Sequence, residues 1–289
     1  MTTIAGRTVV VTGGAAGIGR LVALKMVARG ATAVLWDLDE ERLRHTVAEL
    51  EGATAGSAAA HGVVCDVADR AAVERAATRT AGLAGPVDIL VNNAGVVSGK
   101  YLVDLAPEEI ERTFAVNTLS LFWVTKAFLP QMIARGSGHV VTVASAAGLI
   151  GSPKETDYAA SKFAAFGFDE ALRQELRRSA PGVLTTIVCP YYIDTGMFAG
   201  VKTRFPLLLP ILKEDRVAAK IVRAVQLNRR RLFMPPMVYT TPPMRLLPVP
   251  LFDLVSDLFG VNACMDDFVG RAGSGPAGPK PEAPVGEAS

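Results

Sequence analysis

The chain has 289 residues, of which 50% are hydrophobic and 20% are charged, and its formal net charge is +2. This apolar content suffices for a large core and excludes a wholly disordered chain. The near-neutral balance gives no electrostatic reason to expect a nucleic-acid partner. The three cysteines and three histidines are widely spaced, so we expect neither a disulfide framework nor a metal site.

Short apolar runs alternate with longer amphipathic stretches along most of the chain. We predict strands at Thr8–Thr12, Ala33–Trp36, Gly62–Cys65, Ile89–Asn92, His139–Ala144, Leu184–Cys189 and Arg231–Met234. We predict helices at Glu40–Glu51, Arg70–Ala81, Pro107–Arg135 and Asp157–Arg178. Most strand runs are rich in Val, Ile and Leu without alternation, which is typical of strands buried on both faces. The expected fold is therefore a single Rossmann-like, doubly wound α/β sheet of about seven parallel strands with helices on both faces.

We expect one dinucleotide-binding and catalytic domain over residues 1–271. Within it, an apolar flap at 191–212 and a C-terminal extension at 236–271 interrupt the strand–helix rhythm. Residues 272–289 consist mainly of Gly, Pro, Ala and charged residues, which predicts a disordered tail. Only a few residues precede the first apolar run and no span of about 18 apolar residues occurs, so we expect a cytoplasmic protein.

A glycine-rich turn, TGGAAGIG at 12–19, follows the first strand and opens a helix. Gly13, Gly17 and Gly19 would let the backbone turn sharply and approach a pyrophosphate, and Ile18 lies in the same turn. A tight turn without a ligand is the alternative for such a motif. Its position between strand and helix favours cofactor binding.

Asp37 ends the second predicted strand, 18 residues after Gly19. A carboxylate there can accept hydrogen bonds from both ribose hydroxyls of NAD and would repel the 2′-phosphate of NADP. Ala16 and Leu38 offer no basic group for that phosphate. The alternative is that Asp37 only caps the following helix. We predict NAD as the cofactor.

Tyr158 and Lys162 are four residues apart on a predicted helix and so share one face. A neighbouring ammonium and a positive nicotinamide ring should both lower the pKa of the phenol, which allows Tyr158 to act as acid and base. Ser145 follows the fifth predicted strand and would hydrogen-bond the reacting oxygen. A surface Tyr–Lys pair and a serine that only begins a loop are the alternatives.

These motifs occur in the same order as in the short-chain dehydrogenase/reductase family, which the chain resembles over about residues 5 to 235. The resemblance implies that Asp66 and Val67 border the adenine and that Lys162 also binds the nicotinamide ribose. It further implies that Asn117 belongs to the catalytic group and holds a water linking Lys162 to solvent. The remaining cofactor contacts that it implies are Asn93, Ala94, Gly95, Pro190, Ile193 and Thr195.

The chain departs from the family pattern after Pro190, where Tyr191 replaces the usual glycine. The stretch from Cys189 to Phe198 is similar to the branch that holds retinol dehydrogenases and lipid-droplet hydroxysteroid dehydrogenases. That similarity implies a lipophilic alcohol substrate, oxidised with NAD. The residues expected to line its pocket are Tyr191, Tyr192, Met197, Phe198 and Phe205, and ordinary core or dimer contacts are their alternative role.

The C-terminal extension carries an apolar face over Leu251–Phe259. We favour a lid or a subunit contact for it over a weak membrane-surface contact, because Asp253 and Asp257 disfavour anionic lipid. The family resemblance implies a homodimer or homotetramer. Three other functions stay open: an NADPH-dependent ketoacyl-type reductase, a catalytically inactive cofactor sensor, and a lipid carrier at a membrane surface.

Overall fold

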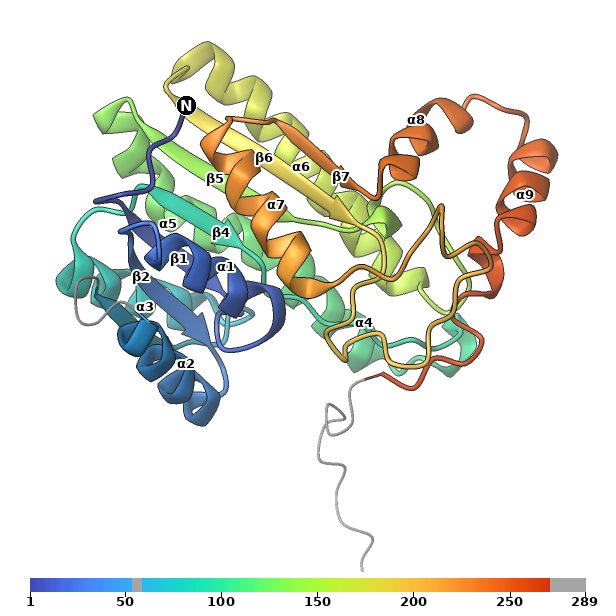
Figure 1. Ribbon diagram of the computed structural model, residues 1–289, viewed down its shortest axis with the longest axis horizontal. Coiled ribbons are helices and arrows are strands. Elements are labelled where there is room, and N and C mark those ends of the chain that lie inside the picture. The colour runs from blue at the N-terminus through green and yellow to red at the C-terminus, as the bar shows by residue number, and fades with distance from the viewer. Residues whose placement is uncertain (54–58, 271–289) are drawn as a thin grey trace, which may run out of the picture.

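The computed structural model describes residues 1–53 and 59–270 (Figure 1). One parallel sheet runs through the molecule in the strand order β3-β2-β1-β4-β5-β6-β7. Its strands are β1 Thr8–Thr12, β2 Thr32–Asp37, β3 Ala60–Val64, β4 Ile89–Asn92, β5 Gly138–Val143, β6 Val183–Pro190 and β7 Arg231–Met234. The predicted doubly wound fold is confirmed, and the predicted disordered tail at 272–289 lies outside the described residues.

Helices cover both faces of this sheet. Three of them pack on one face: α1 Gly17–Val27, α2 Glu40–Ala53 and α7 Glu214–Gln226. Three others pack on the opposite face: α3 Arg70–Ala84, α5 Ser120–Arg135 and α6 Thr156–Ser179. In β1, Val9 and Val11 belong to the first core and Val10 to the second, because successive strand side chains point to opposite faces.

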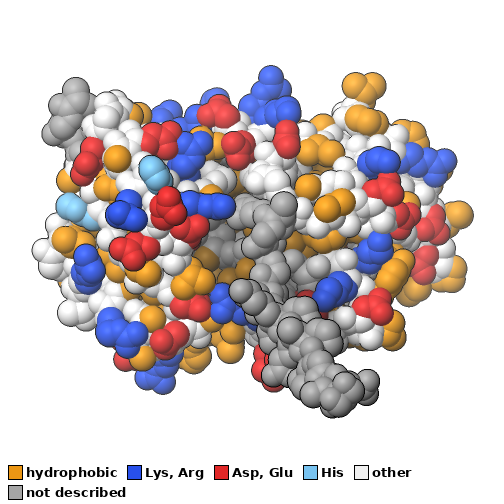
Figure 2. Space-filling model, turned by 90° about the horizontal axis from the view of Figure 1, so that it is seen from below, with side chains coloured by type: hydrophobic (Ala, Val, Ile, Leu, Met, Phe, Trp, Pro, Cys, Tyr) orange, Lys and Arg blue, Asp and Glu red, His pale blue; other side chains and the backbone are white. Residues whose placement is uncertain are grey.

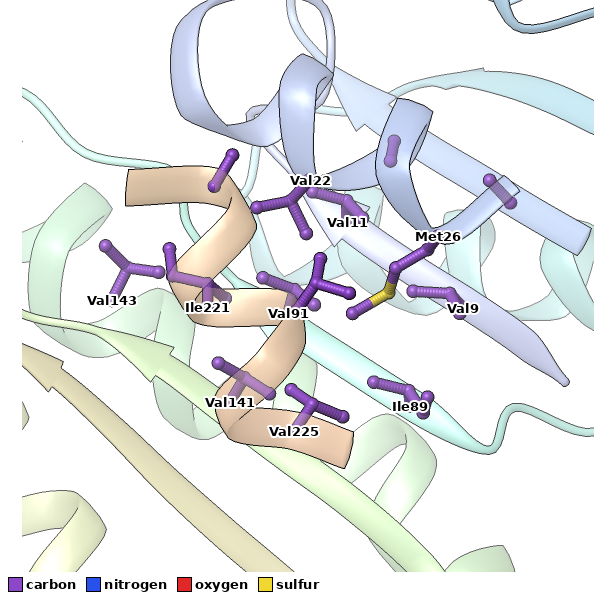
Figure 3. Packing of buried hydrophobic residues seen from close by; sticks show 14 of the residues in the cluster. Val9, Val11, Val22, Met26, Ile89, Val91, Val141, Val143, Ile221 and Val225 are labelled. Carbon is purple, nitrogen blue, oxygen red and sulfur yellow. The ribbon is translucent and has the colours of Figure 1, made fainter. Parts of the chain in front are cut away.

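The core under α1 and α7 holds these two helices on the central strands (Figure 3). The buried side chains of this layer are aliphatic apart from two methionines, Met26 and Met234. Figure 3 labels Val22 and Met26 of α1 and Ile221 and Val225 of α7 together with the strand residues Val9, Val11, Ile89, Val91, Val141 and Val143. The layer fixes the N-terminus of α1 at the carboxyl end of β1, where the strand order reverses between β1 and β4.

The long helix predicted at Pro107–Arg135 is broken into three parts. It consists of α4 Pro107–Phe114, a π-helical turn at Ala115–Leu119 and α5. A π turn widens the helix by one residue and is frequent near functional sites. Asn117 lies in the middle of this turn and is buried. The sequence shows no break there, because the apolar periodicity continues across it.

The flap and the C-terminal extension lie beyond the end of β6. Within the flap, Ile193 and Leu212 form an isolated bridge. The extension contains α8 Thr241–Met244 and α9 Val249–Leu258, which project to one side in Figure 1. Its end returns to the flap, where Cys264 and Met265 are buried against Tyr192 and Val201. The end of the extension is therefore folded against the flap.

The charged residues are spread over the surface. Figure 2 shows one face on which acidic and basic side chains are interspersed. Across the described residues, no helix combines the length and the apolar character needed to cross a membrane.

Asp169 of α6 is a buried acid whose ionisation should weaken the fold. It is 2% exposed, and its Oδ1 has no hydrogen-bond partner among the described residues. Burial raises its pKa to about 7, against the opposing effect of Arg173. The pKa of Asp169 is higher in the folded protein than in the unfolded chain. The contribution of this residue to the free energy of unfolding is therefore most favourable at acidic pH and declines as the pH rises from about 4 through 7.

We expect Asp169→Asn to raise the free energy of unfolding at pH 8 by about 1–3 kcal/mol and to change it little at pH 4.5. Urea denaturation of both proteins at the two pH values measures this difference. Asp253→Asn, at an exposed position on α9, is the matched control and should be neutral at both. An equal effect of Asp169→Asn on the free energy of unfolding at the two pH values would show that ionisation of Asp169 is not what weakens the fold.

Candidate active site

The glycine-rich loop between β1 and α1 depends on three glycines. Gly13 and Gly17 have φ of +63° and +51°, the left-handed region that favours glycine. A Cβ on Gly19 would overlap the carbonyl oxygen of Gly13 and lie 2.6 Å from Nδ2 of Asn93. The first turn of α1 holds no acidic residue, so its free N–H groups and positive dipole end can face an anion.

Asn93 ties the end of β4 to this loop. Its Nδ2 donates to the carbonyl oxygens of Thr12 and Gly13 at 3.0 and 3.1 Å, and its own N–H donates to Oγ1 of Thr12 at 3.0 Å. The N–H of Ala94 donates to the same Oγ1 at 3.1 Å. These bonds hold the glycine loop and the predicted Asn93–Gly95 segment as one unit.

Because Gly19 packs against that unit, we expect Gly19→Ala to weaken NAD binding about tenfold through displacement of the loop. Gly82→Ala is the matched control: it lies in α3, and an added Cβ there meets nothing within 4 Å. That control should be neutral or stabilise by about 0.5–1 kcal/mol. Calorimetric titration with NAD compares the two, and unchanged affinity in Gly19→Ala would contradict the loop's predicted role.

Asp37 lies at the end of β2 beside the loop. Its Oδ2 accepts from the N–H of Ala15 at 2.9 Å and its Oδ1 from the N–H of Asp39 at 3.2 Å. The first turn of α2 is capped by Asp39, whose Oδ1 accepts from the N–H of Arg42 at 3.0 Å. Asp37 therefore does not serve as the cap of α2, the alternative considered from the sequence. Its carboxylate is oriented by two backbone donors and faces the cavity.

Asp66 and Val67 follow β3 at the next strand end. Oδ1 of Asp66 accepts from the N–H of Ala68 at 3.0 Å, and Oδ2 accepts from Nη1 of Arg112 at 3.1 Å. Val67 is buried at 6% exposure, and both residues line the same cavity as Asp37. A flat apolar group at this end would lie against Val67 with polar atoms within reach of Asp66.

Ser145, Tyr158 and Lys162 meet at the other end of the cavity. Ser145 follows β5 in extended conformation, and its Oγ accepts from the N–H of Ala147 at 3.1 Å. Tyr158 and Lys162 lie in the first part of α6, and Nζ of Lys162 is 5.6 Å from the centre of the Tyr158 ring. Nζ also donates to the carbonyl oxygen of Val143 at 3.1 Å, which anchors it beneath the cavity.

Burial controls the ionisation of this group. It lowers the pKa of Lys162 to about 8, so the amine is mostly cationic at neutral pH. It also raises the pKa of Tyr158 above its ordinary value, and hydrogen bonding from Ser145 opposes that shift. The sequence predicts that Lys162 and a nicotinamide ring together lower the pKa of Tyr158. In the polypeptide alone, burial has the larger effect and the pKa is raised.

Asn117 lies behind the cavity, not in its wall. Its amide nitrogen donates to the carbonyl oxygen of Val96 at 2.9 Å and to Oγ of Ser161 at 3.0 Å, and its Oδ1 accepts from the N–H of Val96 at 2.8 Å. A Cβ on Gly95 would lie 3.3 Å from Oδ1 of Asn117 and 3.4 Å from Nζ of Lys162. Asn117 and Lys162 thus approach the same glycine from the π turn and from α6.

A single cavity of about 500 Å³ connects these groups. The predicted cofactor and catalytic residues that line it are Gly13, Gly17, Ile18, Asp37, Asp66, Val67, Asn93, Ala94, Gly95, Ser145, Tyr158, Lys162, Pro190, Ile193 and Thr195. Gly19 and Asn117 support it from behind. Its length, from an acid at the end of β2 to a tyrosine on α6, and its glycine cradle fit a dinucleotide.

The residues predicted for the substrate pocket are divided by the structure. Tyr191, Met197 and Phe198 line the main cavity, and the Phe198 ring packs edge-on against Tyr158 at 5.8 Å between centroids. Tyr192 is buried beside them and lines a second, smaller cavity. Phe205 is not among the residues that line either cavity; its ring packs against Phe259 of the extension at 5.9 Å.

Comparison with known proteins identifies the family. The profile described as "short chain dehydrogenase" matches residues 7–204. The chain belongs to the short-chain dehydrogenase family. Epidermal retinol dehydrogenase 2 of Mus musculus is 41% identical over 93% of this chain and 87% of its own length, and retinol dehydrogenase 10-B of Danio rerio is 37% identical over 93% and 86%. The family resemblance predicted from the motifs is confirmed, and the chain is an oxidoreductase of this family.

Solved structures of other short-chain dehydrogenases share the fold. One from Burkholderia phymatum in complex with NAD superposes with a TM-score of 0.78 at 29% identity, covering 87% of this chain and 96% of its own. An alcohol dehydrogenase from the archaeon Thermococcus sibiricus, complexed with 5-hydroxy-NADP, superposes with a TM-score of 0.69 at 26% identity, covering 79% and 95%. Solved proteins of this fold thus hold either NAD or an NADP derivative.

Two residues that line the cavities of this short-chain dehydrogenase were not predicted from the sequence. Arg42 lines the cavity near Asp37, and its Nε pairs with Oδ2 of Asp39 at 3.1 Å. Glu155 is buried in the second cavity, three residues before Tyr158. Arg42 could have been found as the first basic residue after Asp37 on a predicted helix. Glu155 lies between predicted elements, where no periodicity indicates burial.

Proposed function

We propose that this short-chain dehydrogenase uses NAD to interconvert a lipophilic primary or secondary alcohol and its aldehyde or ketone. One observation carries the proposal: Ser145, Tyr158 and Lys162 lie at one end of a single cavity and Asp37 at its other end. The acid at the ribose end supports NAD over NADP, because a carboxylate there hydrogen-bonds ribose hydroxyls and repels a phosphate.

Bound NAD would supply the hydride acceptor beside Tyr158. As the carbinol carbon loses its hydride, the hydroxyl proton passes to the phenolic oxygen of Tyr158; in reduction the same oxygen returns a proton to the carbonyl. The Ser145 hydroxyl holds the reacting oxygen by a hydrogen bond. Lys162, fixed on the carbonyl oxygen of Val143, supplies positive charge that favours the phenolate and hydrogen-bond donors for a ribose.

The aromatic and apolar side chains around this centre support a lipophilic substrate. Tyr191, Met197 and Phe198 face the cavity, and Phe198 packs on both Tyr158 and Tyr192. Relatives with 37–41% identity are named retinol dehydrogenases. We extend that preference to this chain as a class, a long or polycyclic alcohol, without assigning one compound.

The end of the C-terminal extension is proposed to act as a lid on this pocket. Phe268 lies over Gly99, where a Cβ would overlap its ring, and packs against Phe198 at 6.4 Å between centroids. A cytoplasmic location, peripheral contact with a membrane surface and a homodimeric or homotetrameric state stay predictions. Light scattering of the purified protein checks the last of these.

The test is a panel of alcohols from isopropanol through decanol to retinol and a hydroxysteroid, with NAD, followed by absorbance of the reduced nicotinamide. We expect kcat/KM to rise with chain length. Turnover only of ketones with NADPH would instead favour the ketoacyl-type reductase. NAD binding without turnover in either direction would favour the cofactor sensor. Vesicle flotation that depends on Leu251–Phe259, together with no turnover, would favour the lipid carrier.

A further inference from the structure

A second cavity adjoins the main one behind Ser145. Its volume is about 30 Å³, and Ser145, Tyr191 and Phe198 line both cavities. Its other walls include Glu155 and Tyr192. A cavity of this size holds one or two groups the size of a water molecule. A substrate whose reacting carbon lies at Ser145 can therefore extend a small polar group into it.

Glu155 places an incompletely bonded carboxyl in this cavity. The residue is 2% exposed, and both of its side-chain hydrogen bonds fall on Oε2, from Oγ of Ser152 and from the hydroxyl of Tyr192 at 3.3 Å. Oε1 has no hydrogen-bond partner among the described residues. Although Glu155 is the N-cap residue of α6, its side chain makes no capping hydrogen bond. Helix capping therefore does not explain a buried acid at this position.

The surroundings of Glu155 do not neutralise its charge. The titratable groups around it are Asp157 and Tyr158 on its own helix, Tyr191 and Tyr192 on the flap and Cys264 on the extension. No described Lys or Arg forms an ion pair with it. The adjacent Lys154 directs its Nζ to the carbonyl oxygens of Met265 and Asp266 instead. With no cation beside it, the second oxygen of this acid stays available to hydrogen-bond a polar group that enters the cavity.

We propose that Oε1 of Glu155 binds a second hydroxyl group of the substrate, so that the enzyme prefers diols over simple alcohols. This inference rests on the proposed function. A hydroxyl both donates and accepts, so it can bond the carboxylic acid and, more strongly, the carboxylate. Burial raises the pKa of Glu155 to about 7, so both forms are populated at neutral pH. Tyr191 and Phe198 would enclose the hydrocarbon between the two hydroxyls.

The experiment compares kcat/KM for decan-1-ol with that for each decanediol bearing one primary hydroxyl, with NAD. We expect the wild-type enzyme to favour at least one diol by about 10- to 100-fold, mainly through KM. In Glu155→Leu the ratio of kcat/KM for the diol to that for decan-1-ol should fall to about one. In Glu108→Leu, at an exposed position on α4, it should stay at the wild-type value. The ratio within each variant cancels any general change in activity.

Glu155→Gln keeps the shape and can still hydrogen-bond a hydroxyl, and it covers the case in which the leucine variant does not fold. Its preference for the diol should persist but stay constant with pH, whereas the wild-type preference should rise as the pH passes through about 7 and Glu155 ionises. A preference that survives in Glu155→Leu, or a glutamine variant that retains the wild-type pH profile, would overturn the assignment. Wild-type turnover of decan-1-ol with no diol advantage means that water alone fills the cavity, whereas no turnover of any alcohol would refute the proposed function itself.

Discussion

Tyr158→Phe is expected to lower kcat for alcohol oxidation by about 10²- to 10⁴-fold while NAD affinity stays within about threefold. The substitution removes the phenolic oxygen that we assign to proton transfer and nothing else. The ring is 5% exposed and packs edge-on against Phe198, so a phenylalanine retains its packing. The loss should therefore appear in kcat and not in the folded fraction.

Steady-state kinetics with decan-1-ol and calorimetric titration with NAD separate these two quantities. Tyr239→Phe is the matched control: its hydroxyl accepts from the N–H of Phe233 at 3.3 Å, remote from the cavity, and its side chain is half exposed. Because burial raises the pKa of Tyr158, we also expect the wild-type kcat for oxidation to rise with pH as the phenolate forms. Retention of more than one tenth of the activity by Tyr158→Phe would refute its assignment as the base.

The cofactor side of the site could be predicted from the sequence because its residues follow strands. In a parallel sheet the carboxyl ends of all strands meet at one edge, so the sequence predicts that Thr12, Asp37, Asp66, Asn93 and Ser145 lie close together. The apolar runs that define those strands are strong signals, and strand ends agree within two residues. The π turn at Asn117 could not be predicted from the sequence, since the helical periodicity does not change there.

The substrate side could be predicted only in part. Phe205 was expected in the pocket because it lies in an apolar loop, yet it packs on Phe259 of the extension. Loop side chains follow no period, so composition does not tell which of them face inward. The packing of Cys264 and Met265 on the flap joins segments more than 60 residues apart, a contact that only the tertiary structure determines. The same holds for the burial of Glu155.

Asp37 is expected to make NAD at least about 100-fold better than NADP in kcat/KM, because its carboxylate would lie against the 2′-phosphate. Asp37→Asn removes the charge and leaves an oxygen able to accept from the N–H groups of Ala15 or Asp39, so the loop should keep its shape. We expect the NAD-to-NADP ratio to fall about 10- to 100-fold in this variant. Initial rates with both cofactors at a fixed alcohol concentration measure it.

Arg42 influences how much the ratio of kcat/KM for NAD to that for NADP can change in Asp37→Asn. It lines the cavity beside Asp37, and its guanidinium is occupied by Asp39 in an exposed pair worth little, about 0.2–1 kcal/mol. Once Asp37 is neutral, a 2′-phosphate can compete for Arg42, since guanidinium–phosphate hydrogen bonds are stronger than such a pair. Asp37→Asn with Arg42→Ala should then use NADP less well than Asp37→Asn alone. If the two variants use NADP equally, relief of repulsion by Asp37 accounts for the whole change, and a wild-type enzyme indifferent to the two cofactors would remove Asp37 from the cofactor site.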